Sequence, residues 1–199
     1  MDAGDDIRTF IAIELPTSLR DHLDALLRQL KRKRDNDIKW VDAANIHLTL
    51  KFLGSVKSEL IAEISAVMAR AAAGSVPFDM HLAATGAFPN LTRPQVAWVG
   101  LGGETEALNQ LLKTLESGLE PLGFAPERRP FRAHLTLARL KDRAGPATRS
   151  SLGERLRAVA TDRCDFRVDG VALIRSRLSP EGPHYSQLAV APLSPLSTS

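Results

Sequence analysis

The chain has 199 residues, of which 44% are hydrophobic and 25% are charged, and its formal net charge is +3. This balance is that of an ordinary globular protein and excludes a strongly basic nucleic-acid coat protein, although local clusters of Lys and Arg could still bind phosphate groups. Cys164 is the single cysteine, which excludes an internal disulfide framework and a zinc site built from cysteines.

Targeting and membrane signals are missing from the sequence pattern. Residues 1–6 are acidic and lack the apolar core of a signal peptide. The longest apolar runs are far shorter than the roughly 20 residues that a membrane span needs. The lone cysteine also suits a reducing compartment. We therefore expect a soluble, cytoplasmic protein that does not bind membranes, and a monomer, because no segment implies a protein partner.

Hydrophobic periodicity and turn residues divide the chain into alternating strands and helices. In chain order we expect a strand at 8–15, a helix at 19–30, strands at 39–41 and 46–53, a helix at 57–73, strands at 78–88 and 96–101, a helix at 104–119, a strand at 131–140, a helix at 150–160, and strands at 166–176 and 184–191. Basic runs at 31–34 and 128–132 have two interpretations, a solvated surface or a contact with RNA phosphates.

The tetrapeptide His-Leu-Thr-Leu occurs twice, at residues 47–50 and 134–137, and each copy lies in an expected strand. Side chains alternate along a strand, so each His shares a face with its Thr while the leucines point the other way into a core. A single copy could be an ordinary strand with a solvated polar face. Two copies are harder to explain by packing, because packing needs the leucines and not the histidines.

The expected elements repeat as well as the motif. Strand, helix, motif strand, helix, strand occurs over about 8–88 and again over about 96–176. Matching Phe10 with Trp98, His47 with His134 and Phe78 with Phe166 gives offsets of 88, 87 and 88 residues. We therefore predict a single domain over residues 1–199 with an α+β fold. Its two pseudo-symmetric lobes would each have an antiparallel sheet with helices on the outer face, and the motif strands would line a central cleft.

Two facing imidazoles suit acid–base chemistry at phosphorus. Imidazole titrates near neutral pH, so one ring can accept a proton while the other donates one. In an in-line displacement the attacking and leaving oxygens lie on opposite sides of phosphorus, which matches an acid and a base on opposing strands. Hydroxyl groups of Thr49 and Thr136 could donate to phosphate oxygens. No metal site is expected, because neither motif has a further ligand at suitable spacing, and the sequence has neither a Gly-x-Ser-x-Gly elbow nor a P-loop.

These motifs resemble those of the 2H phosphoesterases, and within them the RNA 2′,3′-cyclic phosphodiesterases, which are also known as 2′-5′ RNA ligases. The resemblance extends from Arg8 to about Leu193. It is carried by residues 8–13, 40–41, 45–54, 86–89, 93–94, 130–139 and 176–182. Ala133 departs from the family pattern, which often has Pro at that position.

The resemblance implies hydrolysis of a terminal 2′,3′-cyclic phosphate on RNA, or on a nucleotide, to a 2′-phosphomonoester without a cofactor. His134 would accept the proton of water, and His47 would protonate the departing 3′ oxygen. Thr49 and Thr136 would hold phosphate oxygens. The resemblance also places Arg139 at the site, whereas the residues alone would equally allow a surface arginine. Two alternatives remain, namely RNA 2′-5′ ligation as the reverse reaction and a non-catalytic RNA- or nucleotide-binding module.

Overall fold

The protein's structure, a computed structural model, describes residues 6–179 and 182–194. The first half of the chain forms β1 (Ile7–Ile13), α1 (Thr17–Leu30), β2 (Ile38–Trp40), the 3₁₀ helix η1 (Ala43–Asn45), β3 (Leu48–Val56), α2 (Leu60–Ala73) and β4 (Phe78–Phe88). The second half forms β5 (Val96–Gly103), α3 (Thr105–Leu119), the 3₁₀ helix η2 (Glu120–Leu122), β6 (His134–Leu140), α4 (Pro146–Ala158), β7 (Asp165–Val168), β8 (Gly170–Ser179) and β9 (Gly182–Pro192).

Two antiparallel sheets carry the fold, as the α+β prediction requires. The β1 sheet has the strand order β3-β1-β8-β9, and the β5 sheet has the order β2-β6-β5-β4-β7. Each sheet combines strands from both halves of the chain, because β8 pairs with β1 and β4 pairs with β5. The two sequence repeats are therefore interleaved, and each contributes its third strand to the sheet of the other.

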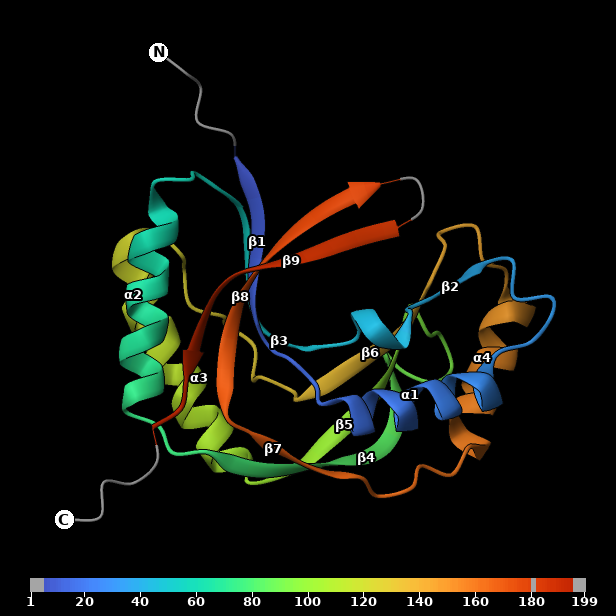
Figure 1. Cartoon of the computed structure of the whole chain (residues 1–199). Helices are drawn as coiled ribbons and strands as arrows, with labels where there is room; N and C mark the ends of the chain where they lie inside the picture. The colour runs from blue at the N-terminus through green and yellow to red at the C-terminus, as the bar shows by residue number, and fades with distance from the viewer. Residues whose placement is uncertain (1–5, 180–181, 195–199) are drawn as a thin grey trace.

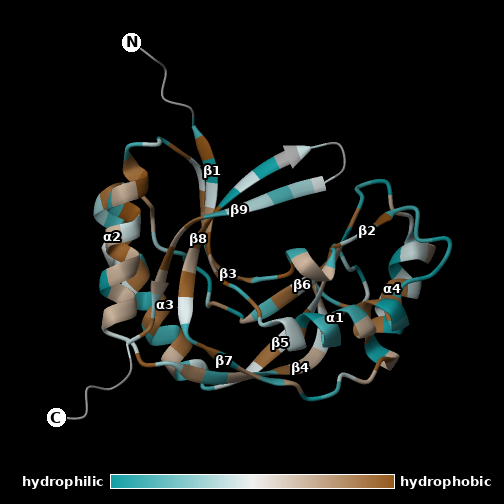
Figure 2. Ribbon diagram, in the orientation of Figure 1, coloured by the Kyte–Doolittle hydropathy of each residue, from teal (hydrophilic) through white to brown (hydrophobic). Residues whose placement is uncertain are grey.

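The helices cover the sheets in pairs that again mix the two halves. Figure 1 shows α2 and α3 side by side against the β1 sheet, and α1 and α4 beside the β5 sheet. In α1 the buried side chains follow the helical spacing read from the sequence; they are Leu19, Leu23, Leu26, Leu27 and Leu30. Hydrophobic residues follow the strands beneath the helices, whereas the far half of the β8–β9 hairpin is largely hydrophilic (Figure 2). No described helix is both long and apolar enough to cross a bilayer.

Two expectations need correction. The expected strand at 166–176 is two strands, because the chain leaves the β5 sheet after β7 and enters the β1 sheet with β8. Asp169 and Gly170 lie at this junction, and both are residue types that favour turns. Helix α4 begins at Pro146 rather than 150, since Pro is tolerated in the first helical turn. Residues 180–181, within the segment 176–182 that resembles the family, lie outside the described residues.

One landmark of the repeat is displaced by two residues. Thr49 pairs with Ala12, whereas the equivalent Thr136 pairs with Trp98. In ladder register, therefore, Trp98 corresponds to Ala12 and not to Phe10. The indole of Trp98 covers Gly86 on β4, where a Cβ atom would lie 2.3 Å from the ring. Only glycine accommodates this close approach.

Candidate active site

The two motif strands, β3 and β6, contact each other where the two sheets meet. His134 is the first residue of β6, and His47 immediately precedes β3. The leucines of both motifs are buried, with exposed fractions of 4% or less; they are Leu48, Leu50, Leu135 and Leu137. The predicted division between leucines that pack in the core and a half-buried His–Thr face is thus confirmed.

A short connection brings the first motif close to the second. Strand β2 pairs with β6, and the backbone N–H of Val41 continues this ladder by donating to Leu137 O at 2.9 Å. The chain then turns through η1, whose start is capped by the carboxylate of Asp42, which accepts from the backbone N–H of Ala44. His47 follows within one further turn of chain. Because β2 pairs with β6, which carries the second motif, the chain that follows β2 places the first motif close to the second.

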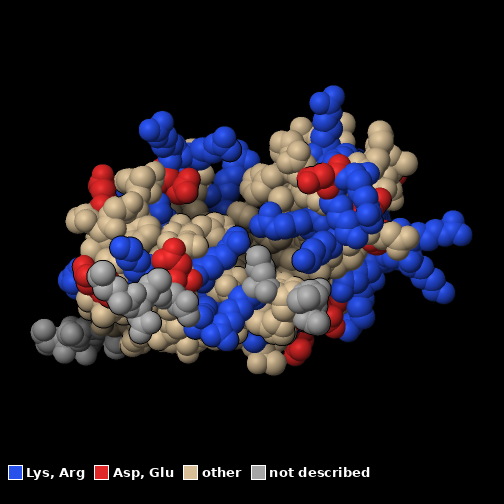
Figure 3. Space-filling view, turned by 90° about the horizontal axis from the view of Figure 1, so that it is seen from above, with Lys and Arg blue, Asp and Glu red and all other residues tan. Residues whose placement is uncertain are grey.

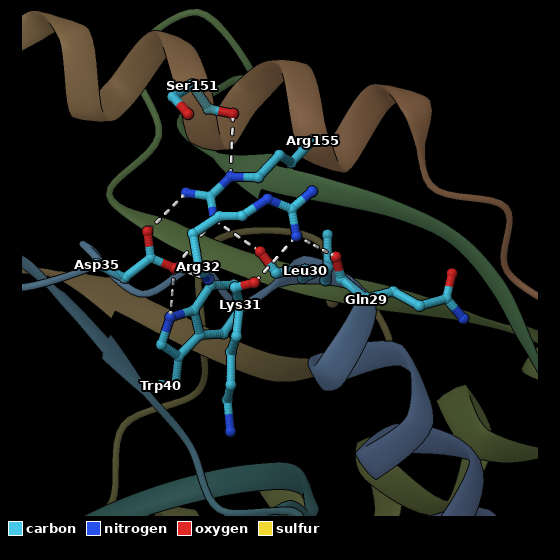
Figure 4. A network of polar contacts seen from close by, with 8 residues as sticks. All are labelled: Gln29, Leu30, Lys31, Arg32, Asp35, Trp40, Ser151 and Arg155. Atoms are coloured by element: carbon cyan, nitrogen blue, oxygen red, sulfur yellow. Dashed lines mark hydrogen bonds and ion pairs between the residues drawn. The ribbon is translucent and has the colours of Figure 1, made fainter.

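A carboxylate in the segment between α1 and β2 ties β2 to α4. Figure 4 shows Asp35 between Arg155 of α4 and Trp40 of β2. Arg155 donates to both carboxylate oxygens at 2.9 and 3.2 Å, and the indole N–H of Trp40 donates at 3.1 Å. Burial alone would raise the pKa of Asp35, but the hydrogen bonds from Arg155, Arg32 and Trp40 outweigh it, and the pKa lies below its ordinary value.

Both imidazoles are held by the same kind of hydrogen bond. His47 Nδ1 lies 2.9 Å from Asn45 O, and His134 Nδ1 lies 2.6 Å from Arg132 O. A carbonyl oxygen only accepts, so Nδ1 must carry a proton in each ring. The opposite nitrogen, Nε2, then has a lone pair when the ring is neutral and a proton when it is charged. Within residues 6–179 and 182–194, neither Nε2 has a hydrogen-bond partner.

Aromatic rings surround each imidazole. His47 stacks on Phe10 with centroids 4.5 Å apart and planes inclined by 24°, and it meets Tyr185 edge-on at 5.2 Å. His134 meets Phe88 edge-on at 5.0 Å and lies 6.3 Å from Trp98. Burial lowers the pKa of His47, and the backbone hydrogen bond with Asn45 offsets this only in part. In the free protein His47 is therefore shifted toward its neutral form.

A bulge in each motif strand determines which later side chains join the site. In the ladder β3–β1 the residue without a partner between Thr49 and Lys51 is Leu50, and in β6–β5 it is Leu137. Arg139 stands five residues after His134. In a regular strand an odd separation places two side chains on opposite faces. The bulge restores Arg139 to the face of His134 and Thr136.

The positive charge of Arg139 on β6 acts on Tyr185 of β9, in the other sheet. Burial raises the pKa of the Tyr185 hydroxyl, while the positive charges of Arg139 and Arg8 act in the opposite direction. The guanidinium of Arg139 is thus within electrostatic range of the ring that packs against His47. Lys39 lies directly opposite Arg139 in the β2–β6 ladder, and like charges in such a pair are unfavourable unless an anion binds.

Sequence reasoning missed two residues of this region. Tyr185 is the only tyrosine of the chain, and its contact with His47 depends on the pairing of β9, far along the chain from the first motif. Lys51 is only 4% exposed; it donates to Glu116 Oε1 at 2.9 Å and to Ala125 O at 2.6 Å. The one available signal was a lysine inside an otherwise apolar strand, which indicates a buried partner.

Charge on the surrounding surface is mainly positive. Figure 3 shows that Lys and Arg predominate across the middle of the face that bears the β8–β9 hairpin. The described residues include no group of three or more His, Cys, Asp or Glu side chains placed to hold a metal ion. A shallow hollow of about 390 Å³ between β4 and the end of α4 is lined by Thr85, Leu156 and Thr161 among others and contains none of the candidate residues.

The sequence profile described as "LigT like Phosphoesterase" matches residues 13–98 and then 99–185, one match for each half of the chain. The chain belongs to the LigT-like phosphoesterase family. An RNA 2′,3′-cyclic phosphodiesterase of Methanothermobacter thermautotrophicus is 34% identical over 185 residues, which cover 92% of this chain and 97% of that protein. A protein of the same description from Thermus thermophilus is 34% identical over 188 residues, with 92% and 88% covered.

Solved structures superpose on this chain over almost its whole length. A protein of Thermus thermophilus superposes with a TM-score of 0.77 at 30% identity, covering 96% of this chain and 100% of that one. Escherichia coli LigT in complex with 3′-AMP superposes with a TM-score of 0.74 at 26% identity, covering 96% and 99%. The family expected from the two motifs is thereby confirmed.

Proposed function

We propose that this LigT-like phosphoesterase hydrolyses the terminal 2′,3′-cyclic phosphate of RNA to a 2′-phosphomonoester by two-histidine acid–base catalysis. The observation that carries the proposal is the equivalent placement of His47 and His134, each with Nδ1 bound to a backbone carbonyl and Nε2 left open. Curated relatives that match most of this chain are described as RNA 2′,3′-cyclic phosphodiesterases, which supports the choice of substrate.

In this mechanism the two rings divide the proton transfers. His134 Nε2 accepts a proton from water, and the resulting hydroxide attacks phosphorus. The bond between phosphorus and the 3′ oxygen breaks on the far side, and His47 Nε2 donates a proton to that oxygen. The product keeps its phosphate on the 2′ oxygen. The carbonyl bonds at Nδ1 keep both Nε2 atoms available for these transfers.

Groups beside the histidines would bind the phosphate. Thr49 and Thr136 are half-buried, and within the described chain neither hydroxyl makes a hydrogen bond, so both are available to non-bridging oxygens. The exposed guanidinium of Arg139 shares the face of His134 and adds positive charge. Such preorganised donors stabilise the charge that develops on the phosphate in the transition state.

Substrate binding would also prepare His47 for its role as an acid. Burial disfavours the charged imidazolium in the free protein. A bound phosphate carries negative charge, and a nearby opposite charge favours the protonated ring. The bound phosphate would therefore favour the protonated ring that His47 needs in order to act as an acid.

An RNA chain fits the positive surroundings of the site. Lys39 and Arg139 form a like-charge pair across β2 and β6, which a backbone phosphate would neutralise. Lys and Arg also predominate on the surface around the hairpin (Figure 3). RNA as the substrate and the lone, buried Cys164 favour a cytoplasmic location. We propose that the enzyme acts there as a monomer.

The decisive experiment incubates the protein with an oligonucleotide that ends in a 2′,3′-cyclic phosphate. We expect a product whose phosphate resists a phosphatase specific for 3′-phosphates, because the 3′ oxygen is the leaving group. If that phosphatase removed the phosphate, the phosphate would be on the 3′ oxygen, and the 2′ oxygen would be the leaving group instead. The same incubation with added RNA that has a free 5′-hydroxyl tests for ligation. Binding of the oligonucleotide without any turnover would identify a non-catalytic module and overturn the proposal.

A further inference from the structure

A row of polar side chains crosses the β1 sheet one step beyond the ring that packs on His47. Phe10 and the His47 imidazole stack on one face of this sheet, which we call the site face. Arg8 stands two residues before Phe10, and β1 pairs with β8 without a register shift, so the Arg8 side chain lies on the site face as well. Ser55 of β3 is the direct partner of Arg8 and shares that face.

The β8–β9 hairpin adds two further hydroxyl groups to this row. Tyr185 lies on the site face, since its ring meets Phe10 and His47 edge-on at 5.3 and 5.2 Å. Ser176 pairs directly with Tyr185, so the two side chains point the same way. The register of β8 with β1 places Ser176 alongside Arg8. One guanidinium and three hydroxyl groups are thus brought together from four strands.

These four side chains, the Arg8 cluster, have hydrogen-bonding groups that the protein leaves unused. Arg8 is exposed, and within the described chain it forms neither an ion pair nor a hydrogen bond. In the same part of the chain the hydroxyl groups of Ser55, Ser176 and Tyr185 make no hydrogen bond either. Burial raises the pKa of Tyr185, and the positive charges of Arg139 and Arg8 oppose this rise, which shows that the Arg8 guanidinium lies close enough to act on the phenol. A cation among free hydroxyl donors suits an anion.

We propose that the Arg8 cluster binds the phosphodiester that joins the last two nucleotides of the RNA, an inference that rests on the proposed function. In the proposed mechanism the cyclic phosphate lies between the two imidazoles. Two residues of strand separate Arg8 from Phe10, which is roughly 7 Å. This step is similar to the separation of neighbouring phosphates along a nucleotide chain. The cluster therefore meets the next phosphate of the chain.

A second phosphate site makes the enzyme favour RNA over a cyclic mononucleotide. A nucleoside 2′,3′-cyclic phosphate with a free 5′-hydroxyl has no second phosphate for the Arg8 cluster to bind. Phosphate contacts carry no sequence information, so the preference does not depend on base identity. The contact is electrostatic, and its contribution to binding should weaken as the salt concentration rises.

The test uses two oligonucleotides that end in a 2′,3′-cyclic phosphate and differ only in the last internucleotide linkage, a phosphodiester in one and an uncharged methylphosphonate in the other. Wild type should have the lower KM for the phosphodiester substrate. For that substrate Arg8→Gln should raise KM about 10-fold, the low end for a hydrogen bond to a charged group, because the guanidinium is exposed. The value of kcat should change far less, since the contact is the same in the ground and transition states. For the methylphosphonate substrate, wild type and Arg8→Gln should have the same KM.

Two further variants separate this contact from simpler causes. Tyr185→Phe removes the hydroxyl but keeps the ring beside His47, and it should raise KM only for the phosphodiester substrate. Arg70→Gln removes one positive charge from an exposed position on α2, which packs on the opposite face of the β1 sheet. It should change neither KM, and thermal melting should show all variants folded.

The possible outcomes separate the Arg8 cluster from the proposed function. Equal wild-type KM values for the two substrates would overturn the second phosphate site. An equal rise of both KM values in Arg8→Gln would also overturn it, because the guanidinium would then act on the cyclic phosphate. In both cases wild-type turnover would still uphold the proposed function. A wild-type protein that cleaved neither substrate would overturn the proposed function itself.

Discussion

The imidazole of His47 stacks on the phenyl ring of Phe10, with centroids 4.5 Å apart, and this contact buries the ring from which a proton must leave. Burial disfavours the imidazolium, so in the free protein the pKa of His47 should lie below 6.5. An NMR pH titration, with the signal assigned by its loss in His47→Gln, measures this value. Added inorganic phosphate should raise it. A free-protein pKa at or above 6.5 would contradict the buried, neutral ring.

The same shift makes stability depend on pH. Between the folded pKa of His47 and its ordinary value near 6.5, the unfolded chain binds more protons than the folded one. The stabilisation is therefore fully present above pH 6.5 and is lost as the pH falls through the folded pKa. Urea unfolding at a series of pH values should show a smaller loss in His47→Gln than in wild type across this window.

Removing either imidazole should lower kcat far more than it weakens substrate binding. His47→Ala and His134→Ala should each lower kcat by roughly 10²- to 10⁴-fold, as loss of a general acid or base typically does. Binding of the substrate should fall much less, because Thr49, Thr136 and Arg139 remain. The double variant should be little slower than the slower single one, since the two groups act as a unit. Near-normal kcat in either single variant would rule out the two-histidine mechanism.

Turnover should persist after treatment with a chelator. The proposed acid and base supply both proton transfers, so the reaction needs no Lewis acid to activate water. The measurement is the initial rate before and after dialysis against EDTA, with added Mg²⁺, Mn²⁺ or Zn²⁺ as the comparison. Loss of activity in EDTA that a divalent ion restored would show that the site works differently.

The motifs could be located from the sequence because two identical tetrapeptides encode the same local pattern, a His and a Thr on one face and leucines on the other. The face to which the side chains beyond Thr49 and Thr136 point could not be predicted in this way. It depends on bulges at Leu50 and Leu137, and a leucine does not indicate a bulge, because it also fits a regular strand. Period-two reasoning therefore assigns the wrong face to the residues directly beyond each bulge.

The exchange of strands between the two sheets could not be predicted from the sequence either. Apolar residues on both sides of Asp169 and Gly170 read as one continuous strand, and only tertiary pairing decides that β7 and β8 belong to different sheets. Tyr185 was missed for a related reason, because its contact with His47 joins β9 to the segment before β3. Local patterns predict which face of a strand is buried, but not which strand lies beside it.

Lys51 and Glu116 form an ion pair with side-chain exposures of 4% and 18% that joins β3 to α3. Glu116 also accepts from the backbone N–H of Glu127, shortly before the second motif. Lys51→Met removes the cation beside this carboxylate and should lower the free energy of unfolding by about 3–5 kcal/mol in urea denaturation. Adding Glu116→Leu should recover part of the loss, because the uncompensated charge is then removed.

A surface ion pair provides the control for Lys51. Arg28 and Asp24 on α1 form a pair whose side chains are 69% and 45% exposed. Arg28→Ala should change the free energy of unfolding by no more than about 0.5 kcal/mol, since exposed helix pairs contribute little. A loss for Lys51→Met that was no larger than this would show that the buried pair contributes no more than a surface one.

Asp35 should contribute to a second, more acidic part of the stability profile. Burial opposes its ionisation, but hydrogen bonds from Arg155, Arg32 and Trp40 hold its pKa below the ordinary 3.8. A depressed carboxyl pKa contributes stability that is present above pH 3.8 and is lost as the pH falls through the folded pKa. Asp35→Asn should therefore lower the free energy of unfolding at pH 7 and flatten its pH dependence below about pH 4. Asp79→Asn, in an exposed pair with Arg167, should leave both unchanged.

Because Asp35 also holds Trp40 beside β6, Asp35→Asn should lower kcat even at temperatures where circular dichroism shows the variant fully folded. Retained stability at pH 7 together with wild-type kcat would show that β2 keeps its place without this carboxylate.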